Sequence, residues 1–284
     1  MEILDGKKID EIETQKLIAE FKEASQNIGR KARLAIVQVG DNPSSNKYIE
    51  YKLKKAEQLD VEATLYKYDE NISQKDLLKQ IDVINEKSDG VIIQLPLPNT
   101  TAPQVILDSV QFEKDIDGLS TRNSFNFYNS NNAFYFTPAT AMAILTLIDY
   151  YNLEIEDKKI SVVGRSNLVG KPIAFLLKKR KGLVSTYNIN SGLRGTENAD
   201  LIIAAAGKAK LIKRKNVHDG VTIIDVGCNL DDATERTKLI GDVDLEDIKD
   251  LVKAIAPVPG GIGPLTVVSL FKNLLKAFKH QNPY

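Results

Sequence analysis

The chain has 284 residues, which is long enough for one large domain or two smaller ones, each with a hydrophobic core. Its 38 basic and 38 acidic residues cancel, so no strong net charge favours nucleic acid or an anionic membrane. One cysteine, Cys228, excludes an internal disulfide, and two histidines argue against a histidine-dependent catalyst or a metal centre. The first residues carry no signal-peptide pattern and no apolar run could span a bilayer, so a soluble cytoplasmic protein is expected.

Short apolar runs alternate with helical patterns along most of the chain, which predicts an α/β fold with parallel strands. Several runs are apolar throughout, as expected for strands that are covered on both faces. The predicted strands are Arg33–Val39, Ala63–Tyr68, Gly90–Gln94, Ile160–Gly164, Val184–Asn188, Leu201–Ala205 and Thr222–Val226. The helical patterns between them include Tyr48–Leu59, Lys75–Glu86 and Lys171–Arg180.

A domain boundary is predicted between Ser120 and Pro138, where residues rich in asparagine and aromatic side chains show no clean period. Thr137-Pro138 is typical of an N-cap and a first helical residue, so a helix that links two domains should follow. A second helix, after Pro264, is the expected return link. We therefore predict one domain of residues 1–138 plus 265–284 and a second domain of residues 139–264.

The segment Ile160–Gly170 has the order of a dinucleotide-binding unit, with a strand, a glycine turn and then a helix. Its glycine spacing differs from G-x-G-x-x-G, so an ordinary strand–helix turn is an alternative. An NAD site usually has a carboxylate at the end of the second strand, and Thr186–Gly192 contains none. Arg165 and Ser191 would instead receive a 2′-phosphate, and charge-assisted hydrogen bonds of roughly 1.5–3 kcal/mol would favour NADP.

Two later strands end in small residues, near Gly207 and Gly227. Small residues at the carboxyl ends of parallel strands let a flat cofactor approach closely, although simple packing explains them equally well. The expected nucleotide-binding residues are Gly164, Arg165, Ser166, Gly170, Ser191, Gly207 and Gly227.

Three prolines and three glycines between Ala256 and Thr266 predict a defined loop, because they combine fixed and unusually free backbone angles. Apolar residues at helical spacing follow, so the loop should open a helix near Pro264. Backbone amides at such a helix entrance suit a polar or anionic ligand. A plain connector between domains is the alternative.

Four polar residues are candidates for chemistry. Tyr48 and Lys52 lie four residues apart on a predicted helix and share one face. Gln94 ends a predicted strand, and Asp117 lies in the turn-like segment Lys114–Gly118. Spacing alone favours an exposed helix face for Tyr48 and Lys52, and only the joint occurrence of the four residues indicates a site.

Taken together, the chain resembles the bifunctional, FolD-like methylenetetrahydrofolate dehydrogenase/methenyltetrahydrofolate cyclohydrolase family. The matching segments follow the family's order over nearly the whole chain: Val39–Lys52, Gly90–Pro98, Lys114–Gly118, Val162–Pro172, Val226–Asn229, Gly241–Asp244 and Pro257–Thr266.

This resemblance implies a folate-binding catalytic domain and a Rossmann-like NADP-binding domain, joined by long helices, with folate in the cleft between them and commonly a homodimer. It implies that NADP oxidises 5,10-methylenetetrahydrofolate and that the 5,10-methenyl product is hydrolysed to 10-formyltetrahydrofolate at the same site. Lys52 matches the family's catalytic lysine and Gln94 the glutamine that works with it. Tyr48 would lie beside the folate rings, and Asp117 would hold the pterin. The segment Pro259, Gly260 and Gly261 would also contact the substrate.

With no histidine in a matching motif, Lys52 is the available titrating group for hydrolysis. A free lysine has a pKa of about 10.4 and is protonated near neutrality. Our hypothesis is that a closed cleft and a cationic substrate lower the pKa of Lys52.

Two segments depart from the family pattern. Tyr135–Thr140 replaces Pro-Cys-Thr-Pro-x-Gly, which changes local packing, and Asn190-Ser191 replaces a frequent His-Ser near the nucleotide. The alternatives are a dehydrogenase without hydrolase activity, using NAD or NADP, and a non-catalytic protein that binds folate or a dinucleotide. The joint presence of Lys52 and Gln94 argues against the first, and the four candidates together argue against the second.

Overall fold

The computed structural model describes residues 1–98, 101–129, 133–230 and 239–283. The chain divides into two compact units. The first, here called the three-stranded unit, contains Ile12–Ala139 and Val267–Tyr284. The second, the six-stranded unit, contains Met1–Glu11 and Thr140–Thr266. The first eleven residues join the second unit because β1 (Glu2–Ile3) pairs in parallel with β11 (Val252–Ala256).

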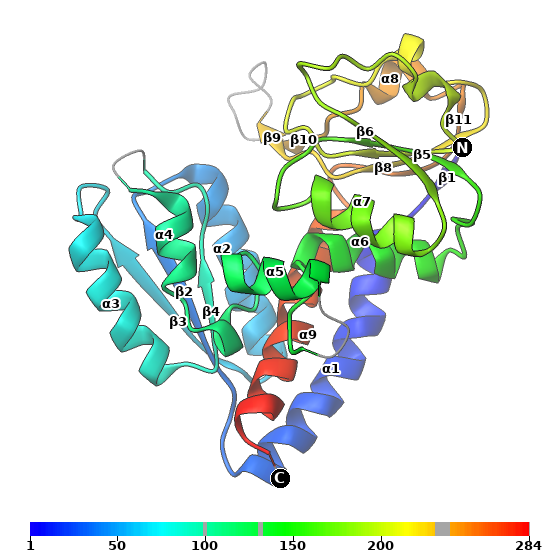
Figure 1. Cartoon of the computed structure of the whole chain (residues 1–284). Coiled ribbons are helices and arrows are strands. Elements are labelled where there is room, and N and C mark those ends of the chain that lie inside the picture. The colour runs from blue at the N-terminus through cyan, green and yellow to red at the C-terminus, as the bar shows by residue number, and fades with distance from the viewer. Residues whose placement is uncertain (99–100, 130–132, 231–238, 284) are drawn as a thin grey trace. The chain divides into compact units, whose positions relative to one another are not determined.

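The three-stranded unit is built on a parallel sheet with β2 (Arg33–Val39) between β3 (Glu62–Tyr68) and β4 (Gly90–Ile93). Side chains alternate along β2, so Leu34 and Ile36 belong to one core, whereas Ala35 and Val37 belong to another. Helices α3 (Gln74–Lys87) and α4 (Pro103–Asp108) pack on the second face, and Figure 1 shows them side by side. The first face is covered by α1 (Gly6–Ile28), α2 (Pro43–Gln58) and α9 (Ile262–Gln281).

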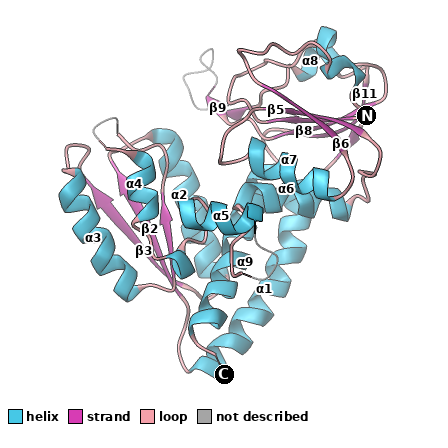
Figure 2. Ribbon diagram, viewed as in Figure 1, coloured by secondary structure: helices cyan, strands magenta, loops and turns pink. Residues whose placement is uncertain are grey.

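The six-stranded unit has a parallel sheet in the order β1-β11-β8-β7-β5-β6. The further strands are β5 (Lys159–Val163), β6 (Leu183–Tyr187), β7 (Leu201–Ala204) and β8 (Val221–Asp225). Helices α6 (Ala139–Tyr150) and α7 (Gly170–Lys179) cover one face of the sheet. Loop segments and α8 (Leu245–Ile248) cover the other face, as Figure 2 shows. Strand β5 has β6 on one side and β7 on the other, so the chain changes direction across the sheet at this strand.

The remaining elements are short. They are the 3₁₀ turns η1 (Phe112–Lys114), η2 (Thr196–Asn198) and η3 (Arg214–Asn216), the helix α5 (Thr121–Asn129), and the antiparallel pair β9 (Asn229–Leu230) and β10 (Leu239–Ile240).

All seven predicted strands are confirmed, with ends that agree to within one residue. The sequence interpretation omitted α1 and β11, and it took the segment that contains α5 to be aperiodic. In α5 the fully buried Asn123 donates to the carbonyls of Gly118 and Phe136 at 3.0 and 2.8 Å. A polar residue therefore occupies a core position of α5 and interrupts the apolar periodicity by which a helix is predicted from sequence. Phe136, in the segment that departs from the family, is itself fully buried.

The proline- and glycine-rich loop is confirmed, and α9 begins at Ile262, two residues before Pro264. Gly260 adopts φ +108°, a conformation that favours glycine. The Gly6 amide donates to the Gly260 carbonyl at 2.9 Å, and a Cβ on Gly6 would lie 1.8 Å from the Gly261 carbonyl oxygen. The loop is therefore packed tightly against the start of α1.

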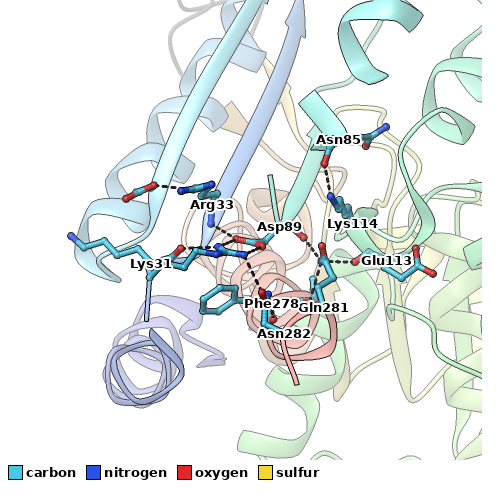
Figure 3. Close-up of polar contacts among 12 residues, drawn as sticks. Lys31, Arg33, Asn85, Asp89, Glu113, Lys114, Phe278, Gln281 and Asn282 are labelled. Atoms are coloured by element: carbon cyan, nitrogen blue, oxygen red, sulfur yellow. Dashed lines mark hydrogen bonds and ion pairs between the residues drawn. The ribbon is translucent and has the colours of Figure 1, made fainter. Parts of the chain in front are cut away.

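Asp89, just before β4, is hydrogen-bonded to residues that follow α1, begin β2 and end α9 in the three-stranded unit (Figure 3). Its carboxylate accepts two hydrogen bonds of 2.7 Å from the Arg30 guanidinium and one of 2.8 Å from the Arg33 amide. Its carbonyl accepts from the side chain of Gln281, near the end of α9, at 2.8 Å. The Arg30 guanidinium also lies over the Phe278 ring, 5.0 Å from its centroid.

We expect Asp89→Ala to lower the free energy of unfolding by about 2–4 kcal/mol, because it leaves a partly buried guanidinium and an amide without their acceptor. Urea denaturation measures this change. The control is Glu62→Gln, which weakens the exposed 3.3 Å pair with Arg33 and longer-range attractions to Arg30 and Lys31, and it should cost less than about 1 kcal/mol. Equal effects of the two substitutions would contradict a structural role for Asp89.

Candidate functional site

Lys52 and Gln94, two of the predicted catalytic residues, are hydrogen-bonded to each other. Lys52 lies in α2 with 6% of its surface exposed, and its Nζ donates to Gln94 Oε1 at 2.8 Å. Gln94 follows β4, where its backbone amide donates to the Val37 carbonyl at 2.8 Å. Its Nε2 donates to the Leu95 carbonyl at 2.9 Å. This second bond fixes the side-chain amide so that Oε1 faces Lys52.

A residue that the sequence interpretation missed, Ser45, supports the same arrangement. Ser45 is 4% exposed, and its hydroxyl donates to the Leu95 carbonyl at 3.2 Å, the same acceptor that orients Gln94. It thereby joins the first turn of α2 to the segment after β4. Its position seven residues before Lys52, two turns earlier on one helix face, was the available sequence signal.

Asp117 lies in a turn that is organised around its neighbour Asp115. Asp115 is 5% exposed, and its carboxylate accepts from the amides of Gly118, Leu119 and Ser120 at 3.1, 3.2 and 2.8 Å. Burial raises the pKa of Asp115 to about 6, although these hydrogen bonds oppose the shift. The sequence interpretation selected Asp117 and gave Asp115 no role, yet an aspartate three residues before a glycine is a recognised turn signal.

Lys52 and Asp117 are close enough to interact electrostatically. Burial lowers the pKa of Lys52, and the negative charge of Asp117 partly opposes this shift. Burial likewise raises the pKa of Asp117, and the positive charge of Lys52 opposes it. The neutral amine of Lys52 is therefore populated at a lower pH than that of a free lysine.

Tyr48 lies one turn before Lys52 on α2 and is partly buried. Its ring meets that of Tyr51 edge-on, with centroids 6.5 Å apart and planes at 81°. The structure thus brings Lys52, Gln94 and Asp117 together through direct interactions, and Tyr48 lies one turn from Lys52 on the same helix.

In the six-stranded unit, the predicted glycine turn follows β5. Gly164 has φ +126°, and a Cβ on it would lie 2.0 Å from the Ala205 carbonyl oxygen. Gly170 begins α7, and a Cβ there would lie 2.0 Å from the Gly164 carbonyl oxygen. Both positions therefore exclude any side chain. The turn lies where the strand order reverses, which is where dinucleotides bind in sheets of this kind.

Arg165 follows β5, and Ser191 follows the neighbouring strand β6. The exposed Arg165 donates to the Thr186 hydroxyl at 3.1 Å and to the Thr186 carbonyl. The Ser191 hydroxyl accepts from the amide of Asn188, three residues earlier in the chain, at 3.0 Å. Ser166 accepts from the Val169 amide at 3.1 Å and so shapes the glycine turn.

Gly207 and Gly227, the other predicted nucleotide contacts, are each bonded to a buried aspartate. Gly207 donates to Asp242 at 2.9 Å, and Gly227 donates to Asp225 at 3.0 Å. A Cβ on Gly227 would lie 2.3 Å from Asp242 Oδ1, so packing explains this glycine. A Cβ on Gly207 would meet nothing within 4 Å. Contacts of these glycines with a nucleotide, and of Pro259–Gly261 with a substrate, stay predictions.

Two negative findings concern the described ranges alone. Within them, no helix combines the length and the apolar character needed to cross a membrane. No group of three or more His, Cys, Asp or Glu residues there could hold a metal ion.

Comparison with known proteins gives full-length matches. The model of the tetrahydrofolate dehydrogenase/cyclohydrolase catalytic domain matches residues 4–117, and that of the NAD(P)-binding domain matches residues 138–282. The bifunctional protein FolD of Mycoplasmopsis synoviae (strain 53) is 49% identical over 281 residues, which cover 98% of this chain and 100% of that protein. The FolD enzyme of Campylobacter jejuni has a solved structure with a TM-score of 0.91, 34% identity and 99% coverage of both chains.

A second solved structure is the Trypanosoma brucei FolD protein complexed with NADP cofactor and an inhibitor. It has a TM-score of 0.93 and 27% identity, and the match covers 99% of this chain and 98% of that one. Both domain models match in order, and the relatives match over their full length. The chain therefore belongs to the tetrahydrofolate dehydrogenase/cyclohydrolase family.

Proposed function

We propose that this protein is a bifunctional enzyme of one-carbon metabolism. It oxidises 5,10-methylenetetrahydrofolate with NADP and hydrolyses the resulting 5,10-methenyltetrahydrofolate to 10-formyltetrahydrofolate at the same site. The observation that carries the proposal is the buried Lys52 amine, bonded to Gln94 and within electrostatic reach of Asp117. A buried lysine whose pKa is lowered suits proton transfer better than a free lysine does.

In the hydrolysis, Lys52 moves the proton. Water adds to the methenyl carbon, and the neutral amine of Lys52 accepts the proton that the water releases. The bond from that carbon to N5 then breaks as the new hydroxyl becomes the C=O of the formyl group. Lys52 returns its proton to N5, the hydroxyl proton is released to solvent, and the formyl group stays on N10. Gln94 holds the Lys52 amine in place through the 2.8 Å hydrogen bond. Because the substrate is a cation, its arrival further disfavours protonated Lys52.

Asp117 and Tyr48 are the proposed folate contacts. A carboxylate is an acceptor-only group, so Asp117 suits the N–H donors on the edge of a pterin. The turn around Asp115 fixes the backbone on both sides of Asp117. The Tyr48 ring offers a flat apolar surface beside the folate rings.

The donor set at the carboxyl end of β6 fits NADP. Arg165 supplies a cation and Ser191 a hydroxyl, and neither Arg165–Gly170 nor Thr186–Gly192 contains a carboxylate. The narrow turn at Gly164 and Gly170 lets backbone amides approach a pyrophosphate. When bound, NADP accepts the hydride, and the protein's task in that step is alignment.

In this proposal the six-stranded unit binds the nucleotide, and the three-stranded unit carries the catalytic residues. We further propose a homodimer located in the cytoplasm, with folates and NADP as its small-molecule partners. Equal numbers of acidic and basic residues give no support for a nucleic-acid or membrane partner.

The direct test follows reduced nicotinamide and methenyl absorbance together, with 5,10-methylenetetrahydrofolate and either NADP or NAD. We expect faster reduction of NADP, little accumulation of methenyl product and 10-formyltetrahydrofolate on chromatography. Persistent methenyl accumulation would show a dehydrogenase without hydrolase activity. Binding of both ligands without turnover would contradict an enzymatic function.

A further inference from the structure

Two buried aspartates meet at the carboxyl end of β8 in the six-stranded unit, and the proposed mechanism uses neither. Asp225 is the last residue of β8 and is 3% exposed, and Asp242 follows β10 and is 1% exposed. The backbone amide of Asp242 donates to Asp225 Oδ1 at 3.0 Å. Burying two carboxylates side by side is unfavourable unless their acceptor sites are filled.

Asp242 receives four amide hydrogens. Its Oδ2 accepts from the backbone amides of Ala206 and Gly207 at 2.6 and 2.9 Å. Its Oδ1 accepts from the Lys208 amide at 2.8 Å and from the Asn229 side chain at 3.0 Å. Because a carboxylate is acceptor-only and each oxygen meets two donors, this site requires aspartate rather than asparagine.

Asp225 holds Asp242 and the next loop in the same way. Its carboxylate accepts from the amides of Gly227, Asp242 and Val243 at 3.0, 3.0 and 3.1 Å. A Cβ on Gly241 would lie 1.8 Å from Asp225 Oδ2, so the chain passes directly over this carboxylate. Burial raises the pKa of Asp225 to about 7, with the charge of Asp242 acting in the same direction.

The loop that Asp242 holds also contacts the proposed nucleotide turn. The Ala205 amide donates to the Val163 carbonyl at 2.7 Å, and the Ala205 carbonyl lies where a Cβ of Gly164 would be. Residues 205–208 therefore have Gly164 on one side and Asp242 on the other. Loss of the Asp242 contacts would free the segment that defines the width of the glycine turn.

We propose that Asp242 is a positioning residue for dinucleotide binding, which acts through the 206–208 loop on the Gly164 turn, with Asp225 as its support. This inference rests on the proposed use of a dinucleotide. At 1% exposure, with four amide donors on its carboxylate, Asp242 acts through the backbone and does not contact the ligand.

The test is Asp242→Asn, with NADPH binding measured by fluorescence titration of the full-length protein. Either orientation of the asparagine amide places an NH₂ group against two donors. We expect the Kd for NADPH to rise at least tenfold, and saturating NADP should largely restore dehydrogenase kcat. Hydrolysis of added 5,10-methenyltetrahydrofolate without nucleotide should stay within twofold of wild type, because Lys52 lies in the other unit.

Asp225→Asn is a second variant with a smaller expected effect. One orientation of the asparagine amide loses only the contact with Val243, so the Kd of this variant for NADPH should rise two- to fourfold. Asp219→Asn, at an exposed position of the same unit, is the control and should bind as wild type does. A wild-type Kd in folded Asp242→Asn would overturn the inference. If Asp242→Asn does not fold, a Kd for Asp225→Asn equal to that of the Asp219→Asn control would overturn the inference. Failure of wild-type protein to bind NADPH would instead reject the proposed function.

Discussion

Lys52→Met is expected to lower the hydrolysis of 5,10-methenyltetrahydrofolate by at least about 10³-fold, because it removes the group that accepts the proton from water. Dehydrogenase activity should fall far less, since hydride transfer needs alignment rather than a base. Methionine has a similar length and no charge, so it can occupy the buried position. Both rates can be measured on one preparation, with added methenyl substrate for the first and NADP reduction for the second.

The pH profile gives the same test an independent readout. Burial lowers the pKa of Lys52, so wild-type hydrolysis should rise with pH as the amine loses its proton, at a lower pH than a free lysine would. The variant should lack this rise. At a pH below the pKa of lysine in the unfolded chain, Lys52 binds its proton more readily in the unfolded chain than in the native protein. Loss of the Lys52 amine therefore removes a destabilising proton linkage at neutral pH, while loss of its contacts with Gln94 and Asp117 acts in the opposite direction.

Lys54→Met is the matched control for Lys52→Met. Lys54 is on the same helix with 65% of its side chain exposed, and it pairs with Glu50 at 2.6 Å in an exposed i,i+4 contact. This control should keep both activities. Hydrolysis near the wild-type rate in Lys52→Met would reject Lys52 as the proton acceptor.

Gly164→Ala is expected to raise the Kd for NADPH about 100-fold, which corresponds to about 2.7 kcal/mol. The added Cβ would lie 2.0 Å from the Ala205 carbonyl oxygen, and φ +126° is unfavourable for alanine. The turn must open to relieve both the clash and the backbone strain, and this displaces the backbone that should hold the pyrophosphate of NADP. Fluorescence titration with NADPH measures the effect, and circular dichroism shows whether the variant remains folded.

Gly220→Ala is the control that distinguishes the steric clash expected in Gly164→Ala from the effect of backbone strain alone. Gly220 also has a left-handed conformation, φ +86°, in the same unit, but a Cβ there would meet nothing within 4 Å. It should lose some stability and keep its affinity for NADPH. If both variants bound NADPH as wild type does, the Gly164 turn would not be the nucleotide site.

The sequence by itself determined the strands and the local chemistry of the two candidate sites. Among the described residues, the sequence predicted seven of the eight parallel strands that have four or more residues, and it missed β11. Continuous apolar runs such as those of β4 and β7 identify strands that are covered on both faces. The glycines at 164 and 170 were identified from the order of strand, glycine turn and helix, and the structure shows that neither position has room for a side chain. Lys52 and Gln94 were selected by resemblance to a family, and spacing alone would have left Lys52 on an exposed helix face.

Only the tertiary structure decided which polar residues work together. Asp225 and Asp242 are acidic residues next to loops, and nothing local distinguishes them from solvated surface carboxylates. Their role depends on backbone amides that converge from other segments, as when Ala206, Gly207 and Lys208 meet Asp242 across more than thirty residues of chain. Burial depends equally on distant elements, and burial is what lowers the pKa of Lys52. Sequence patterns report what each segment needs locally, whereas hydrogen-bond partners and desolvation arise only when the segments pack.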